Sequence, residues 1–221
     1  IIMKAIILNS SRSNDTEALF TETEIEIPSP EPRDVLIRVQ AISVNPIDYK
    51  VRSSPQRQHQ SRILGWDAAG IVEAVGKEVT LFKVGDEVYY AGSVIRAGCN
   101  SEYHTVDERI VGKKPTSLSF AEAAALPLTT ITAWEALFER LGIEPEKTLE
   151  NRSSTVLIIG GAGGVGSIAI QLAKQVAGLR VIATASRAES IAWCKQMGAD
   201  YTINHHQSFK SELAAIDINH V

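Results

Sequence analysis

The chain has 221 residues, of which 44% are hydrophobic and 22% are charged, and its formal net charge at pH 7 is −4. These values indicate an ordinary globular protein of one or two domains, which we expect to be cytoplasmic. The small acidic excess offers no surface for nucleic acid, and no apolar run is long enough to span a bilayer, so we expect neither partner. Two cysteines, Cys99 and Cys194, are too few for a disulfide framework or a four-cysteine zinc site.

The first half of the chain has the pattern of an all-β domain. Alternating apolar residues predict strands at 3–9, 22–27, 34–44, 69–75, 86–90 and 101–106. A proline-rich link at 28–32 separates the second strand from the third, and glycines punctuate the later strands. Many short strands joined by such turns favour a small barrel or a sandwich.

The pattern changes near Ser119. Ser119 and Glu122 have the spacing of a capping box and predict the start of an Ala-rich helix, and a second helix is predicted at 127–141. From Thr155 onward, strands alternate with helices: strands at 156–159, 180–183 and 201–203, and helices at 167–176, 188–197 and 209–213. This order predicts a βαβαβ unit with a parallel sheet and right-handed crossovers.

A glycine-rich turn between the first of these strands and its helix carries the strongest functional signal. Its glycines follow the pattern G-x-G-x-x-G, which permits a tight turn, close approach of a pyrophosphate and close packing of helix on strand. Phosphates would lie at the helix N-terminus, where free N–H groups and the helix dipole favour an anion. We therefore expect a dinucleotide at Gly161, Gly163, Gly164, Val165 and Gly166. The alternative is a glycine-rich turn that binds nothing.

The end of the second strand distinguishes the two nicotinamide dinucleotides. A protein that binds NAD places Asp or Glu about 20 residues beyond the fingerprint, where the carboxylate binds the ribose 2′-hydroxyl. Here the strand is followed by Ser186 and Arg187, with no carboxylate. A guanidinium and a hydroxyl can hydrogen-bond a 2′-phosphate, so the sequence favours NADP(H). The alternative interpretation of Arg187 is a solvated residue at the start of a helix.

The predicted dinucleotide-binding domain looks incomplete. A full domain of this kind has two halves with strand order 3-2-1-4-5-6, whereas this chain supplies only the first three strands. We therefore expect a β domain at 1–125, followed in sequence by an α/β domain at 126–221 that is truncated after its third strand. We also expect a fragment of a longer enzyme that turns over little by itself.

Five stretches follow one another in a recognisable order: 44–50 (VNPIDYK), 64–72 (LGWDAAGIV), 85–88 (GDEV), 123–134 and the glycine fingerprint. Together they resemble the medium-chain dehydrogenase/reductase superfamily, in particular its zinc-independent quinone oxidoreductase branch. The resemblance implies an N-terminal GroES-like, partly open β-barrel that carries the substrate, followed by a Rossmann domain, with the active site in the cleft between them. It also suggests a homodimer, although the chain as given leaves the oligomeric state open.

The same resemblance argues against a catalytic zinc. Zinc-dependent members of the superfamily have a cysteine where this chain has Asn45, and Gly-His-Glu where it has Gly65, Trp66 and Asp67. A zinc site needs three or four converging thiolate, imidazole or carboxylate ligands. None of the five histidines has helical ligand spacing to another. We therefore expect no metal ligand in this chain.

Without a metal, the oxidation of an alcohol lacks its Lewis acid, so the reverse direction is favoured. NADPH would deliver hydride to a small-molecule quinone or α,β-unsaturated carbonyl (enone), while the protein stabilises the charge that develops on the substrate oxygen. The alternatives are a zinc-type alcohol dehydrogenase and a non-catalytic NADPH-binding or structural fragment.

The resemblance also assigns candidate residues. Asn45 and Asp48 belong to the segment beneath the nicotinamide, and Lys50 is the best candidate to hydrogen-bond the carbonyl or enolate oxygen. Thr132 falls where the family contacts the nicotinamide, and His205 follows the third strand, near the expected adenine. The structural alternatives are a helix cap or ion-pair partner for Asp48, a surface lysine for Lys50, an ordinary helix threonine for Thr132 and an exposed histidine for His205.

Overall fold

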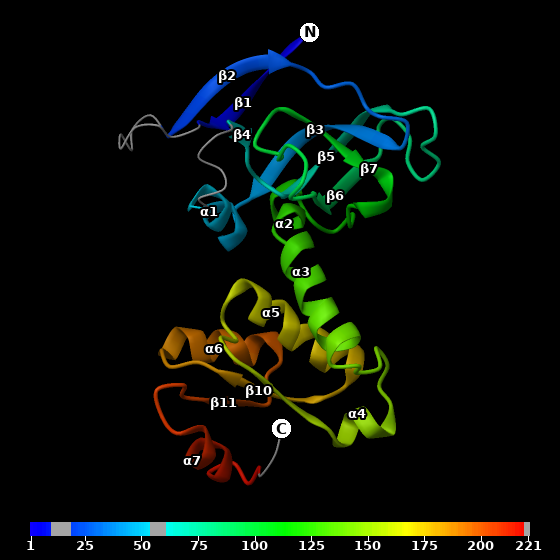
Figure 1. The fold of residues 1–221 in the computed structure, drawn as a ribbon. Helices are drawn as coiled ribbons and strands as arrows, with labels where there is room; N and C mark the ends of the chain where they lie inside the picture. The colour runs from blue at the N-terminus through cyan, green and yellow to red at the C-terminus, as the bar shows by residue number, and fades with distance from the viewer. Residues whose placement is uncertain (10–18, 54–60, 219–221) are drawn as a thin grey trace. The chain divides into compact units, whose positions relative to one another are not determined.

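The structure is a computed structural model that describes residues 1–9, 19–53 and 61–218. The chain divides into two compact units, Ile1–Leu128 and Thr129–Val221, which Figure 1 shows as a ribbon. The first unit is built from antiparallel strands, and the second alternates parallel strands with helices. The predicted order of a β domain followed by an α/β domain with a parallel sheet is therefore confirmed.

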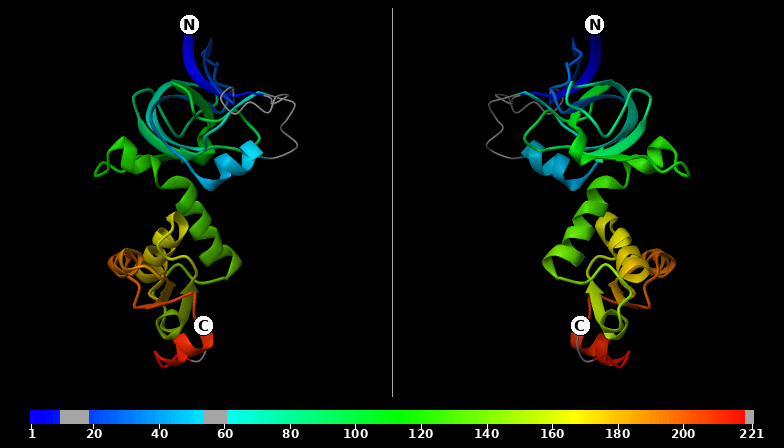
Figure 2. Two further views of the ribbon diagram at one scale, coloured as in Figure 1. Left: turned by 90° about the vertical axis from the view of Figure 1, so that its left-hand side faces the viewer. Right: turned by 90° about the vertical axis from the view of Figure 1, so that its right-hand side faces the viewer.

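Two antiparallel sheets form the first unit. The larger has the order β7-β3-β5-β6-β8, with strands at Tyr103–Asp107, Asp34–Ser43, Asp67–Val75, Glu87–Ala91 and Val111–Lys113. The smaller has the order β2-β1-β4, with strands at Phe20–Glu26, Ile2–Leu8 and Arg62–Ile63. An isolated antiparallel bridge pairs Ala5 of β1 with Ser101, just before β7. The strands curl around a common interior and form a partly open barrel (Figure 2).

Alternation along β3 fills the interior of this barrel. Val35 and Ile37 are fully buried and pack with Val72, Val88 and Cys99. Burying a branched apolar side chain contributes about 1.5–3 kcal/mol relative to leaving it exposed. The alternating pattern therefore favours strand over any other local structure, because only a strand sends every second residue to one face.

Short helices accompany the strands of the first unit: α1 at Pro46–Ser53, a 3₁₀ turn at Glu108–Ile110 and α2 at Phe120–Ala124. The predicted capping box begins α2. Ser119 Oγ accepts a hydrogen bond from the N–H of Glu122, and the Glu122 carboxylate accepts one from the N–H of Ser119 at 2.9 Å. Ala123 and Ala124 are then buried against Ala69 of β5.

The second unit is a parallel sheet with helices on it. The strand order is β11-β10-β9, with strands at Tyr201–Ile203, Arg180–Thr184 and Thr155–Ile158. The helices are α3 (Pro127–Trp134, starting at the end of the first unit), α4 (Leu149–Ser153), α5 (Gly164–Gln171), α6 (Ala188–Met197) and α7 (Phe209–Ala214). α3 and α5 each continue as a π-helix, at Glu135–Arg140 and Leu172–Ala177. No helix in the described part of the chain combines the length and apolar character that crossing a membrane requires.

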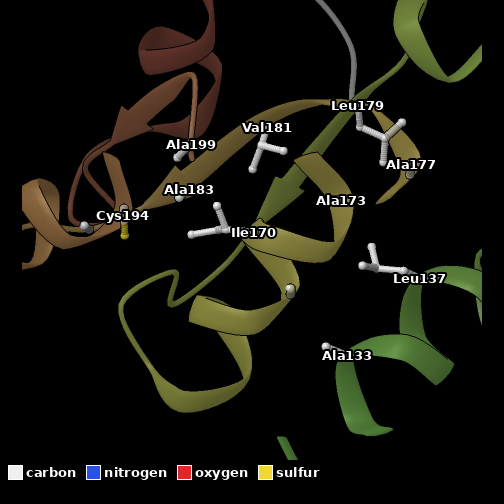
Figure 3. Close-up of a cluster of buried hydrophobic side chains, with 12 residues drawn as sticks. Ala133, Leu137, Ile170, Ala173, Ala177, Leu179, Val181, Ala183, Cys194 and Ala199 are labelled. Atoms are coloured by element: carbon white, nitrogen blue, oxygen red, sulfur yellow. The ribbon is translucent and has the colours of Figure 1, made fainter. Parts of the chain in front are cut away.

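The main core of the second unit lies between α5 and β10 (Figure 3). Ile170 of α5 and Val181 of β10 are fully buried there, and Leu137 joins them from the π-helix that continues α3. Cys194 of α6 is buried in the same cluster. Small residues such as Ala173, in the π-helix that continues α5, allow helix and strand to approach closely, so that this face of the helix is buried.

The structure differs from the prediction chiefly at α1. The sequence predicts a strand to residue 44 and no helix directly after it, whereas β3 ends at Ser43 and Pro46–Ser53 is helical. Only Asp48 and Val51 of α1 are buried, so the apolar periodicity that signals a helix is almost absent. Sequence analysis also misses the short elements β4, β8 and α4, and begins α5 at 167 rather than at Gly164.

We expect Ser119→Ala to lower the free energy of unfolding by about 1 kcal/mol, because α2 loses the hydroxyl that caps its N-terminus. Urea unfolding followed by circular dichroism measures the change. Ser117→Ala is the matched control, because Ser117 is also exposed and its side chain makes no hydrogen bond to the described residues. Equal stabilities of Ser119→Ala and Ser117→Ala would contradict the prediction.

Candidate functional site

The glycine-rich turn joins β9 to α5 and is fastened to the end of β10. Gly160 donates its N–H to Thr184 Oγ1 at 2.8 Å, and Gly161 donates its N–H to the Thr184 carbonyl oxygen at 3.1 Å. Gly160 has a φ of 70°, a left-handed conformation that glycine adopts without strain. α5 begins after Gly163, which offers no capping side chain. Thr184 is a supporting residue that sequence analysis does not identify.

Packing requires two of the three fingerprint glycines. A Cβ on Gly161 would lie 2.9 Å from Cys194 Sγ, and a Cβ on Gly166 would lie 2.4 Å from the carbonyl oxygen of Gly160. Both positions are buried. Gly163 is exposed, and a Cβ there would meet only the Gly160 carbonyl oxygen, at 3.3 Å. The first and third glycines thus serve the contact between strand and helix, and the second leaves the helix N-terminus open.

The N-terminus of α5 is open to an anion. Gly163, Gly164 and Val165 are exposed, and no side chain of the described residues caps the first turn of the helix. Uncapped N–H groups and the helix dipole favour an anion at this position. Helix α3 passes beside the turn, because Thr129 Cγ2 would lie 3.2 Å from a Cβ on Gly164. Thr132 lies about one turn further along α3 and is exposed.

The carboxyl ends of β10 and β11 bring the other predicted cofactor residues to the same edge of the sheet. Ser186 and Arg187 follow β10, and Arg187 is the N-cap residue of α6. Arg187 is exposed and forms no ion pair with the described residues; its Nη2 lies 3.5 Å from Ser190 Oγ. His205 follows β11, is exposed and lies against His206, with 4.3 Å between ring centroids.

A second polar group lies in the first unit, where α1, β5 and the start of α3 meet. Asn45 precedes α1 and donates Nδ2–H to Asp67 Oδ2 at 2.8 Å. Its backbone N–H donates to Asp48 Oδ2, also at 2.8 Å. The other oxygen of Asp67, Oδ1, accepts the N–H of Leu128 at 2.8 Å. Asn45, Asp48 and Asp67 are 7%, 8% and 0% exposed, so the Asp67 carboxylate at the centre of this network is shielded from water.

Burial makes Asp67 an unusual carboxyl group. It raises the pKa of Asp67 to about 6, and the negative charge of Asp48 adds to this effect. The hydrogen bonds from Asn45 and Leu128 act in the opposite direction. Asp67 is therefore largely ionised at neutral pH, as an acceptor with two neutral donors. Sequence analysis misses this role; the available signal is an acidic residue at the start of an apolar strand.

The three candidates in and before α1 have different surroundings. The Asp48 carboxylate accepts the backbone N–H of the residue before α1, so the structure supports the helix-cap alternative for Asp48. Lys50 is exposed on α1 and is not part of the buried network. Next to Asp67, the indole Nε1 of Trp66 is buried and is without a hydrogen-bond partner among the described residues.

Two family models match the chain. The model of the alcohol dehydrogenase GroES-like domain matches residues 31–133, and that of the zinc-binding dehydrogenases matches residues 164–217. A zinc-type alcohol dehydrogenase-like protein from Staphylococcus epidermidis is 46% identical over 96% of this chain and 62% of its own length. The chloroplastic NADPH-dependent alkenal/one oxidoreductase of Arabidopsis thaliana is 35% identical over 86% of this chain and 49% of its own length. The chain thus spans about half to three fifths of these curated relatives.

Solved structures resemble the whole chain. A protein from Rhizobium etli CFN 42 that carries the description of a zinc-dependent alcohol dehydrogenase is 51% identical, with a TM-score of 0.90, over 99% of this chain and 64% of that one. The quinone oxidoreductase from Coxiella burnetii is 33% identical, with a TM-score of 0.79, over 99% of this chain and 66% of that one.

Several of these names imply zinc, and the donor set of the described residues does not fit it. No three His, Cys, Asp or Glu side chains in the described residues are grouped so that they could hold a metal ion. The Cys99 thiol donates to the carbonyl oxygen of Asp67 at 3.4 Å, and burial raises its pKa, which disfavours the thiolate that zinc requires. His104 is held by Tyr90 Oη at 2.9 Å and by the Ala97 carbonyl oxygen at 3.0 Å.

Three observations agree on the family of this chain. The two family models match in the order in which the two units occur. Whole-length similarity extends to both alcohol dehydrogenase-like and quinone oxidoreductase structures. The fold joins a GroES-like domain to a Rossmann-like sheet with a glycine fingerprint. The chain therefore belongs to the medium-chain dehydrogenase/reductase superfamily of oxidoreductases.

Proposed function

We propose that this chain is part of an NADPH-dependent reductase that transfers hydride to quinones or α,β-unsaturated carbonyls without zinc. The observation that carries the proposal is the uncapped N-terminus of α5 together with the end of β10. There an exposed arginine, Arg187, has no ion-pair partner among the described residues, and the strand tip at 182–187 carries no carboxylate. Support for the acceptor class comes from the relatives, which include an alkenal/one oxidoreductase and a quinone oxidoreductase.

We propose a partner of suitable chemistry in the second unit for each part of NADPH. The backbone of Gly163, Gly164 and Val165 would bind the pyrophosphate, and the Ser186 hydroxyl with the Arg187 guanidinium would bind the 2′-phosphate. A phosphate dianion prefers a guanidinium to a carboxylate, so this edge of the sheet favours NADPH over NADH. We further propose His205 for the adenine and Thr132 for the nicotinamide part.

Bound NADPH would supply the hydride, and the protein would bind the acceptor and stabilise its developing negative charge. Lys50 is our candidate for that oxygen, because an exposed ammonium on α1 is free to approach a ligand. We propose a supporting role for Asp48, which fixes the start of α1 through the backbone of Asn45. The donor set of the described residues gives no reason to assign a metal to this chemistry.

Oxidation of NADPH, followed at 340 nm with 1,4-benzoquinone or but-3-en-2-one, tests the proposed activity. We expect oxidation that depends on the acceptor and is unchanged by EDTA, at a low rate for a chain of this length. Fluorescence titration of NADPH runs in parallel. Binding without oxidation would favour either a binding module or a fragment that is inactive by itself. The same assay on a chain extended to the length of the relatives separates these two, and continued absence of oxidation there would contradict the reductase. Loss of activity in EDTA would contradict the metal-free mechanism.

We expect Arg187→Ala to weaken NADPH binding by about 1.5–3 kcal/mol, because a charge-assisted hydrogen bond to the 2′-phosphate is lost. NADH affinity should change little, since NADH has no phosphate at this position. Arg180→Ala is the matched control: Arg180 is an exposed arginine at the opposite end of the same strand. Fluorescence titration with both dinucleotides gives the affinities. Equal losses for NADPH and NADH would exclude the assigned role.

The glycine fingerprint yields a paired prediction. Gly166→Ala should destabilise the second unit by about 1–3 kcal/mol, because its Cβ would overlap the Gly160 carbonyl oxygen. Gly163→Ala should leave stability nearly unchanged and weaken NADPH binding, because its Cβ would occupy the exposed approach to α5. Thermal unfolding and NADPH titration separate the two effects. Tight NADPH binding by Gly163→Ala would argue against a pyrophosphate at this turn.

A further inference from the structure

In the side-chain amide of Asn45, only the NH₂ group has a hydrogen-bond partner among the described residues. Its Nδ2 donates to Asp67 Oδ2 at 2.8 Å, and no hydrogen bond to Oδ1 is found among the described residues. Among the described residues, the only buried side-chain N or O atom without a hydrogen-bond partner is Trp66 Nε1. Asn45 Oδ1 is therefore open to solvent, although the residue as a whole is only 7% exposed.

Asp67 decides which end of the amide faces outward. An ionised carboxylate accepts hydrogen bonds and donates none. Oδ1 of Asp67 already accepts the N–H of Leu128, and Oδ2 faces Asn45. Only the NH₂ end of Asn45 can satisfy that oxygen, so the carbonyl end must face away from Asp67. The backbone of Asn45 cannot relieve this constraint, because its N–H donates to Asp48 Oδ2 and its C=O accepts the N–H of Asp48 at 3.0 Å.

We infer that Asp67 is a positioning residue that makes Asn45 present a hydrogen-bond acceptor, so that Asn45 recognises a ligand bearing an O–H donor rather than a carbonyl. This inference rests on the proposed function and deepens it. A quinone offers only acceptor oxygens, whereas the hydroquinone formed by its reduction offers O–H groups. Asn45 would thus bind the reduced form, and the negative oxygen would be left to a cationic group such as Lys50.

The variant Asp67→Asn reverses this polarity. The oxygen of the introduced amide would accept the N–H of Leu128, and its NH₂ group would face Asn45, whose own amide must then turn over to accept it. All these hydrogen bonds remain satisfied, so the fold should be kept while Asn45 presents a donor. In the double variant Asn45→Asp/Asp67→Asn, the amide introduced at position 67 donates to the carboxylate introduced at position 45. The second oxygen of that carboxylate again faces outward as an acceptor.

Hydrogen exchange tests the orientation without any ligand. The side-chain NH₂ signal of Asn45 in a ¹H–¹⁵N spectrum is identified by its loss in Asn45→Asp. We expect slow exchange in the wild-type chain, where one N–H is donated to a buried carboxylate, and fast exchange in Asp67→Asn. Asp48→Asn is the matched control, because it changes a neighbouring buried carboxyl group and should keep the slow exchange. Slow exchange in folded Asp67→Asn would overturn the inference.

Binding of hydroquinone and of 1,4-dimethoxybenzene, which lacks O–H groups, tests recognition by titration of the same spectra. We expect the wild-type chain to prefer hydroquinone about fivefold, Asp67→Asn to lose the preference and the double variant to regain it. Should Asp67→Asn not fold, Asn45→Ala replaces it, with the same expected loss. Equal binding of both compounds by the wild-type chain would overturn the inference. Failure of the extended chain to oxidise NADPH would instead defeat the proposed function and leave both of these readouts intact.

Discussion

The first unit depends on one buried carboxylate that joins three segments distant in sequence. Asp67 begins β5 and accepts from Asn45, just before α1, and from Leu128, at the start of α3. Removing a carboxylate from water costs several kcal/mol, and here two neutral donors compensate it without a cation among the described members of the network. The raised pKa of Asp67 reflects this incomplete compensation. Asp67 can accept both of these hydrogen bonds in only one arrangement. It consequently fixes where β5, α1 and α3 begin relative to one another.

The glycine turn of the second unit shows a different division of labour. Gly161 and Gly166 are required because side chains there would collide with the neighbouring strand, helix and turn, whatever the turn binds. A Cβ on Gly163 would meet only the Gly160 carbonyl oxygen, at 3.3 Å, and the lack of a side chain there keeps the first N–H groups of α5 accessible. A pattern that looks uniform in sequence thus contains two glycines that packing requires and one, Gly163, that packing does not explain. Of the three glycines, only Gly163 therefore supports the proposal that an anion binds at this turn.

Local regularity explains how much of the fold and of the site the sequence could predict. Alternation in β3 and the capping box at Ser119 act over a few residues, and both elements are found close to their predicted bounds. The glycine fingerprint and Arg187 could be located because each follows directly on a predicted strand. The bonds of Asp67 span 22 and 61 residues, so no local pattern encodes them, and its partner Asn45 could be located only through family resemblance. α1 escaped prediction because the cap at Asp48 and few buried side chains hold it, rather than an apolar stripe.

The two cysteines occupy separate interiors: Cys99 lies in the barrel core and Cys194 in the core beside the parallel sheet. Each thiol is closed to reagents in the folded chain, and the raised pKa of both thiols further suppresses their reaction. An alkylating agent can therefore modify either cysteine only when the surrounding unit opens. Each unit thus contains one buried cysteine. The rate at which each thiol is alkylated would report separately how often the barrel and the Rossmann-like fold open.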